Sequence, residues 1–142
     1  FWWKIDSDLN LSISREFSSS NSDLKVDKLI MKDELRKLDV YMADDQWKGL
    51  SNNVEKLKNG TEKEGIGRFL YNDLNWTNAE AQLSSHIGSI FHQAGVWEFN
   101  GKKRGIQFRK ITDDWHKLMK SYYVECIKQL DDPDQGNSVD LK

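Results

Sequence analysis

The segment from Thr77 to Ile111 has the pattern of one helix followed directly by a β-hairpin, and this constrains the fold more than any other feature. Thr77, with Glu80 three residues later, forms a capping box that marks a helix N-terminus. Gly95 can take the left-handed conformation that ends a helix. We therefore expect a helix over Asn78–Ala94. Its apolar side is formed by residues at helical spacing: Leu83, Ile87, Ile90, Phe91 and Ala94.

Two short runs rich in β-branched and aromatic residues follow this helix, at 96–99 and 106–111. The dipeptide Asn100-Gly101 lies between them and is a strong signal for a hairpin. The loop also carries Lys102, Lys103 and Arg104. A helix with such a hairpin behind it is typical of a recognition helix and its wing.

Periodicity predicts the remaining elements. Alternating apolar residues between Phe1 and Phe17 favour one or two short strands. Further expected segments are a polar loop at Ser18–Ser22, helices at Leu24–Leu38, Asp44–Lys58 and Gly65–Asp73, and a last helix that Thr112 or Asp113 caps. Asn59-Gly60 is expected to end the second of these helices. The last helix has one apolar face, formed by Trp115, Leu118, Met119, Tyr122, Cys126, Ile127 and Leu130.

These elements predict an α+β, mainly helical fold. Its centre is a winged helix-turn-helix with extra N-terminal helices and a closing C-terminal helix. We expect three parts: N-terminal strands and a polar loop at 1–23, the winged-helix domain at 24–130, and an acidic flexible tail at 131–142. A chain of 142 residues is long enough for one hydrophobic core. It does not begin with Met, so we expect an excised domain.

Cysteine and histidine are scarce, which limits the chemistry that the chain can support. A single Cys excludes an intrachain disulfide and favours a reducing compartment such as the cytosol or nucleus. One Cys and three scattered His also disfavour a four-ligand zinc site. No apolar run approaches the roughly 20 residues that a membrane-spanning helix needs.

No catalytic constellation is apparent. His86 and His92 are six residues apart on one helix, so they point about 120° away from each other. His116 lies beside Asp113 and Asp114 and is interpreted as a surface residue, and Cys126 lies on an apolar stripe, where a structural thiol is expected. We therefore expect no enzymatic activity, no catalytic residues, no metal and no cofactor.

The net charge of −2 conceals a positive segment. Residues 86–110 carry five basic side chains against Glu98, whereas residues 1–45 and 131–142 each carry a net charge of −3. The positive charge is therefore concentrated on the predicted wing. The pI near 5.9 argues against strong nonspecific binding to duplex DNA, because such binding needs many phosphate contacts.

The candidate binding residues lie on the predicted recognition helix and wing. For nucleic acid or a partner they are Gln82, Ser85, Ser89, His92, Lys102, Lys103, Arg104 and Arg109. The helix offers no Arg for guanine, so a solvated hairpin or a protein-binding face stays open as an alternative to DNA contact. Trp97 and Phe99 are candidates for a partner surface. Trp47, Trp76 and Trp115 are expected in the core, whereas Trp2, Trp3 and Trp97 are less constrained and are candidates for an exposed partner surface.

From Ser84 to Gln129 the order of helix, wing and immediate amphipathic helix resembles the winged-helix domain at the C-terminus of the Stn subunit of the telomeric CST complex. That domain is itself similar to the one in the middle subunit of replication protein A. The resemblance is carried by Ile87, Ile90, Phe91, Ala94, Gly95, Val96, Phe108, Ile111, Thr112 and Leu118. The Asn- and Lys-rich composition favours a protist member, such as the Stn-like subunit of a ciliate telomerase holoenzyme.

This resemblance implies a non-enzymatic interaction module of a nuclear, telomere-bound complex. Its partners would be OB-fold subunits and polymerase α–primase, and the complex as a whole would bind single-stranded telomeric DNA and support complementary-strand synthesis. The sequence keeps a second hypothesis open: a winged-helix regulator or replication initiator that binds duplex DNA sequence-specifically. No membrane partner is expected.

Overall fold

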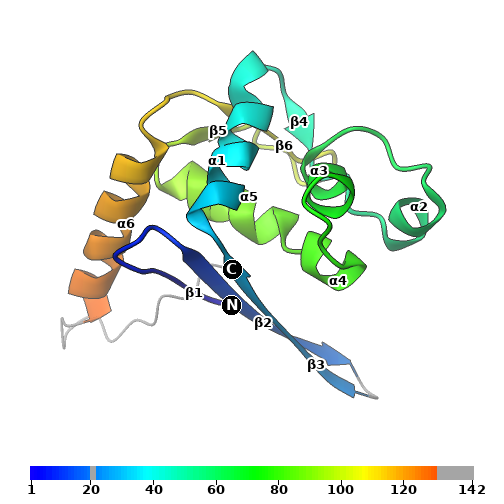
Figure 1. Ribbon diagram of the computed structural model, residues 1–142, viewed down its shortest axis with the longest axis horizontal. Coiled ribbons are helices and arrows are strands. Elements are labelled where there is room, and N and C mark those ends of the chain that lie inside the picture. Colours follow the sequence, from blue (N-terminus) through cyan, green and yellow to red (C-terminus); the bar gives the residue numbers. More distant parts are fainter. Residues whose placement is uncertain (20–21, 131–142) are drawn as a thin grey trace.

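Residues 1–19 and 22–130 are described by the computed structural model. They form a mixed α+β fold with more helix than strand and two small antiparallel sheets (Figure 1). The α+β expectation is therefore confirmed. The predicted tail at 131–142 lies outside the described residues.

The first sheet has the order β1-β2-β3, with β1 at Trp2–Ile5, β2 at Leu11–Ser19 and β3 at Ser22–Ile30. Alternation along the strands separates two faces. The inner face is buried and carries Trp3, Ile5, Leu11, Ile13, Val26 and Ile30. In the turn after β1, the Asp6 carboxylate accepts hydrogen bonds from the backbone N–H groups of Asp8 and Asn10. The strands expected within Phe1–Phe17 are thus confirmed.

The helix predicted over Leu24–Leu38 is wrong in its first half, because residues 22–30 pair with β2 along their whole length. The expected boundary between residues 23 and 24 falls inside β3. The polar loop expected at Ser18–Ser22 is shorter than predicted, since β2 extends to Ser19 and β3 begins at Ser22. Strand alternation places Val26, Lys28 and Ile30 on the inner face. Because Lys28 is polar, the inward positions do not read as a continuous apolar series, and the sequence pattern did not predict a strand here.

The first helix, α1 at Lys32–Tyr41, begins where β3 ends, and the side-chain oxygen of Asn10 accepts a hydrogen bond from the Lys32 N–H. A 3-10 turn, η1 at Met42–Asp44, leads to the short strand β4 at Lys48–Gly49. The helix predicted over Asp44–Lys58 is therefore wrong except at its end. Only α2 at Val54–Asn59 is helical there, and Gly60 ends it with a φ of 78° as expected.

Helix α3 at Ile66–Asn72 agrees with the prediction for Gly65–Asp73. The single helix expected over Asn78–Ala94 is two helices, α4 at Asn78–Ala81 and α5 at Ser84–Gln93. The chain bends at 82–83, so that Leu83 and Ser84 both become buried, and Ser84 accepts a hydrogen bond from Asn52 at 3.1 Å. The capping box of Thr77 and Glu80 is present, and Gly95 has a φ of 84°.

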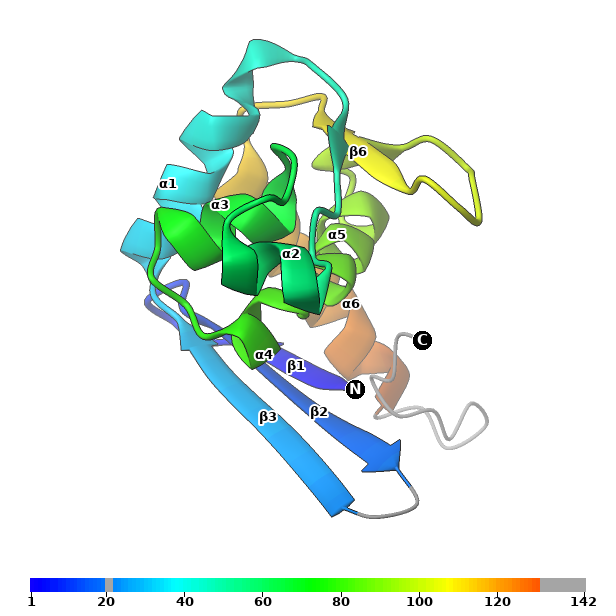
Figure 2. The ribbon, with the colours of Figure 1, turned by 90° about the vertical axis from the view of Figure 1, so that its right-hand side faces the viewer.

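The second sheet has the order β4-β6-β5, with β5 at Trp97–Phe99 and β6 at Gln107–Lys110. This confirms the predicted hairpin. Helix α6 at Trp115–Leu130 follows at once and lies beside β1. Figure 2 shows the loop between β5 and β6 projecting from the helices at one end of the molecule, while β2 and β3 project at the other.

One continuous hydrophobic cluster joins the inner face of the first sheet to the helices and the second sheet. The N-terminal strands therefore share the core of the remaining elements. In residues 1–19 and 22–130, no helix is both long and apolar enough to cross a bilayer.

Candidate partner-binding surface

Helix α5 is held against the second sheet by its apolar side. Gly88 allows this close approach, because a Cβ atom there would lie 2.3 Å from the Phe108 ring. Trp97 of β5 stacks on Phe91 with ring centroids 4.6 Å apart. These contacts fix which side of α5 faces away from the sheet.

The predicted polar residues on α4–α5 are engaged in local hydrogen bonds. The Gln82 amide donates to the backbone and side-chain oxygens of Asn78, at 3.3 Å and 3.2 Å. Ser85 Oγ lies 3.3 Å from the adjacent His86 ring, and Ser89 Oγ accepts from Gln93 at 3.3 Å. His92 is exposed, and its Nδ1 lies 3.3 Å from the Trp97 carbonyl oxygen.

Neighbouring elements cover part of the same side of α5. The Phe1 ring meets the His86 ring edge-on at 4.4 Å, and the Tyr122 hydroxyl of α6 donates a hydrogen bond to the Gln93 side chain. Burial, together with the charge of Arg15, lowers the pKa of His86 to about 4. Gln82, Ser85 and Ser89 are each half-buried.

The predicted basic cluster divides into paired and unpaired residues. Arg109 is neutralised on the outer face of the hairpin, where Glu98 accepts hydrogen bonds from its Nε and Nη2 at 2.9 Å and 2.8 Å. Its guanidinium lies over the Trp47 ring, 4.8 Å from the centroid. Arg109 is therefore held by its own chain, which weakens its prediction as a binding residue.

Lys110, one of the five basic residues predicted to lie on the wing, points inward. Its side chain is 6% exposed, and its Nζ lies 2.9 Å from Asp39 of α1 and 2.8 Å from Asp113. Burial opposes the charge, but the hydrogen bonds to Asp113 and Asp39 outweigh it and raise the pKa of Lys110. The inward position of Lys110 could have been predicted from strand alternation, because Phe108 and Lys110 lie on the same face of β6.

The three basic residues at the tip of the hairpin are exposed: Lys102, Lys103 and Arg104. Among the side chains that the structure describes, no carboxylate forms an ion pair with any of them. Asn100 holds the loop in shape, because its side chain donates to the Gly105 carbonyl at 2.9 Å and accepts from the Lys102 N–H at 3.2 Å. This loop tip, together with His92 and Phe99, is called the α5–wing surface below.

The tryptophans differ from expectation at three positions. Trp76 and Trp115 are buried as predicted, and Trp2 is exposed as predicted. Trp97 is 1% exposed and Trp3 is 4% exposed, so neither can mark a partner surface, whereas Trp47 is 36% exposed and is not core. Phe99 is half-buried and lies 5.6 Å from the His92 ring, so it stays available in part.

The residues considered as candidates for catalysis or metal binding do not form a common site. Cys126 is buried on α6, and burial raises the pKa of its thiol. His116 is exposed at the start of α6. Within the part of the chain that the structure describes, no group of three or more His, Cys, Asp or Glu side chains is arranged to hold a metal ion. The accessible residues of the α5–wing surface are aromatic and basic, an arrangement that suits docking.

Comparisons of this chain with protein-family models, with curated proteins and with solved structures find no match.

Proposed function

We propose that this chain is a non-enzymatic winged-helix interaction module of a telomere maintenance complex. The order of elements supports the winged-helix interpretation: helix α1, strand β4, helices α3 and α5, then the hairpin β5–β6, with β6 between β4 and β5 in the sheet. In this interpretation α5 is the recognition helix, the hairpin is the wing, and α6 closes the domain.

The observation that carries the docking proposal is the covering of α5. A helix that reads base edges must insert its polar side into the major groove. Here Phe1 and Tyr122 contact that side, and Ser85, Ser89 and Gln82 form hydrogen bonds within the chain. The exposed α5–wing surface is better suited to docking a protein, with the loop tip lying close to nucleic acid bound elsewhere in the complex.

The resemblance of Ser84–Gln129 to Stn winged helices supports the cellular setting. In this proposal the chain acts in the nucleus, at telomeres, as a telomerase-associated, CST-like subunit. It contacts OB-fold subunits and polymerase α–primase, and the assembled complex binds single-stranded telomeric DNA.

A titration with DNA separates this proposal from the duplex-binding regulator. We expect little binding of this chain alone to either duplex or single-stranded DNA at low and at moderate salt, measured by fluorescence anisotropy. A regulator would instead bind duplex with a salt-dependent affinity, and replacing Lys102, Lys103 and Arg104 together by Ala would lower the salt slope by about three, one for each lost phosphate contact. That result would overturn the docking proposal. Replacing Lys117 and Lys120 on α6 by Ala is the matched control, since both are exposed lysines away from the hairpin.

A binding experiment tests the partner directly. Purified OB-fold subunits and polymerase α–primase are mixed with the chain, and complex formation is followed by size-exclusion chromatography. We expect co-elution with one of them, weakened by Phe99→Ala and His92→Ala and unaffected by the Lys117 and Lys120 control. If the chain co-elutes with none of these subunits, the result would count against the telomere setting.

A further inference from the structure

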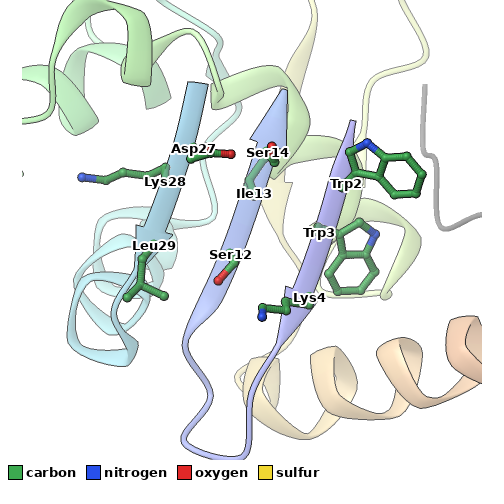
Figure 3. Close-up of a pocket in the computed structure, with 9 residues that line it drawn as sticks. All are labelled: Trp2, Trp3, Lys4, Ser12, Ile13, Ser14, Asp27, Lys28 and Leu29. Atoms are coloured by element: carbon green, nitrogen blue, oxygen red, sulfur yellow. The ribbon is translucent and has the colours of Figure 1, made fainter. Parts of the chain in front are cut away.

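The outer face of the first sheet is open and has a regular layout. The strand register places Trp2, Ser14 and Asp27 in one row across the three strands. It places Lys4, Ser12 and Leu29 in the next. The small serines on the central strand leave a trough of about 470 Å³ between the two edge strands (Figure 3).

Two large apolar side chains remain exposed on this face. Trp2 is 58% exposed and Leu29 is 52% exposed, and they occupy opposite corners of the layout. Leaving such groups in water is unfavourable, and exposed apolar residues gathered around a trough are typical of an interaction site.

The two charged residues occupy the other pair of corners. Lys4 on β1 and Asp27 on β3 are both exposed, and Figure 3 shows both side chains leaning toward the central strand from opposite edges. Each edge strand therefore presents one apolar and one charged residue, in opposite order. A carboxylate can accept several hydrogen bonds, so contacts of Asp27 within its own chain leave capacity for another cation.

This layout is complementary to itself. A two-fold axis parallel to the sheet, along the diagonal from Trp2 to Leu29, brings Lys4 of one copy near Asp27 of the other, twice, with their strand positions offset by roughly 4 Å, which the Lys side chain can span. Trp2 then meets Trp2 of the second copy, and Leu29 meets Leu29. The two edge strands lie about 9.6 Å apart, and the two rows lie about 6.8 Å apart along each strand. Rotation about the diagonal of a rectangle with these sides makes the strands of the two copies cross at about 70°. That angle lies near the orthogonal class of sheet packing.

We propose that this face is the interface of a symmetric homodimer of this chain. The interface is isologous, with each copy contributing the same six residues. Six side chains cover less than the roughly 800 Å² per partner of a standard interface, so the dimer is weak and forms at micromolar to millimolar concentration. The face shares no residue with the α5–wing surface, so this proposal stands or falls separately from the proposed function.

Charge reversal tests the proposal. Sedimentation velocity of the wild-type chain over a concentration series should show reversible dimerisation. Lys4→Glu alone and Asp27→Lys alone should each weaken it at least tenfold, because like charges then face each other. The double variant should recover most of the wild-type affinity, since the pairs are restored with exchanged signs. Lys120→Glu on α6 is the control and should leave dimerisation unchanged.

Circular dichroism and the urea midpoint of each variant establish that it is folded. Should a charge variant fail to fold, Leu29→Ser tests the apolar half of the same interface and should also weaken dimerisation. A wild-type chain that stays monomeric at millimolar concentration overturns the proposal, as does a double variant no better than the single ones. Quenching of Trp2 fluorescence by an oligonucleotide, without dimerisation, would assign the face to nucleic acid instead.

Discussion

Gly88 is the residue at which α5 approaches the wing sheet most closely. A Cβ atom at this position would lie 2.3 Å from Cε2 and 2.6 Å from Cζ of Phe108. Phe108 itself is held between Trp97 and Phe99, with ring centroids 5.9 Å and 5.5 Å away. The Phe108 ring therefore cannot move aside without disturbing two more aromatic rings.

Gly88→Ala should lower the free energy of unfolding by about 1–3 kcal/mol, because the added methyl overpacks a tightly filled interior. Urea unfolding followed by tryptophan fluorescence measures the loss. Ser89→Ala changes the next residue of the same helix, whose side chain faces away from the sheet, and should alter stability by less than about 0.5 kcal/mol. Equal losses in the two variants would show that the packing against Phe108 is not the cause.

At the scale of elements, features set by neighbouring residues were predictable from the sequence. The capping box at Thr77, the helix end at Gly95 and the two strands of the hairpin all depend on local chemistry, and all are present. Elements set by distant partners were not. Strand β4 exists because Lys48 and Gly49 pair with β6, and the Gly67 N–H donates to the Leu50 carbonyl at 2.7 Å. No periodicity within 44–58 contains that information.

The candidate site was predictable only in part, for the same reason. Exposure of Lys102, Lys103 and Arg104 follows from their place in a loop. The neutralisation of Arg109 by Glu98 could have been inferred from cross-strand pairing. The inward position of Lys110 follows from strand alternation in the same way, but its ion pair with Asp39 could not be inferred, because it depends on where α1 lies relative to the second sheet.

Helix α6 packs against the first sheet in part through the Trp3 ring. Trp3 stacks on Tyr122 at 5.6 Å and contacts Tyr123 at 5.2 Å, both on α6. Trp3→Ala should cost about 3–5 kcal/mol, because it removes a buried aromatic ring and leaves a cavity. Amide hydrogen exchange should accelerate more in α6 than in α3.

Trp2→Ala is the matched control for this prediction. It removes the same ring from the adjacent residue, which is 58% exposed on the opposite face. At dilute, monomeric concentration it should change stability by less than about 0.5 kcal/mol. Unchanged protection of α6 in Trp3→Ala would contradict the attachment described here.

At the scale of the whole molecule, stability should depend on pH through His86. The folded state lowers the pKa of this ring to about 4, whereas an unfolded chain keeps it near 6.5. As pH falls below about 6.5, the unfolded state takes up a proton that the folded state does not bind. The stability present above pH 6.5 is therefore lost progressively toward pH 4.

His86→Gln should remove this part of the pH dependence. The comparison is the urea midpoint at about pH 7 and about pH 5, where the wild-type chain should lose more stability than the variant. His116→Gln replaces the same residue type at an exposed position of α6 and should behave as the wild type. Parallel losses in wild type and His86→Gln would assign the dependence to other groups.

The pairing of β4 with β6 also bears on how this chain acquires its structure during synthesis. The β1-β2-β3 meander is complete once residue 30 has left the ribosome, but Lys48 and Gly49 have no strand to join until residues 107–108 follow. The second sheet therefore cannot form until the hairpin has been synthesised, although the helices between β4 and β5 precede it in the chain. Long-range pairing of this kind slows folding and leaves the strand edge unpaired for longer.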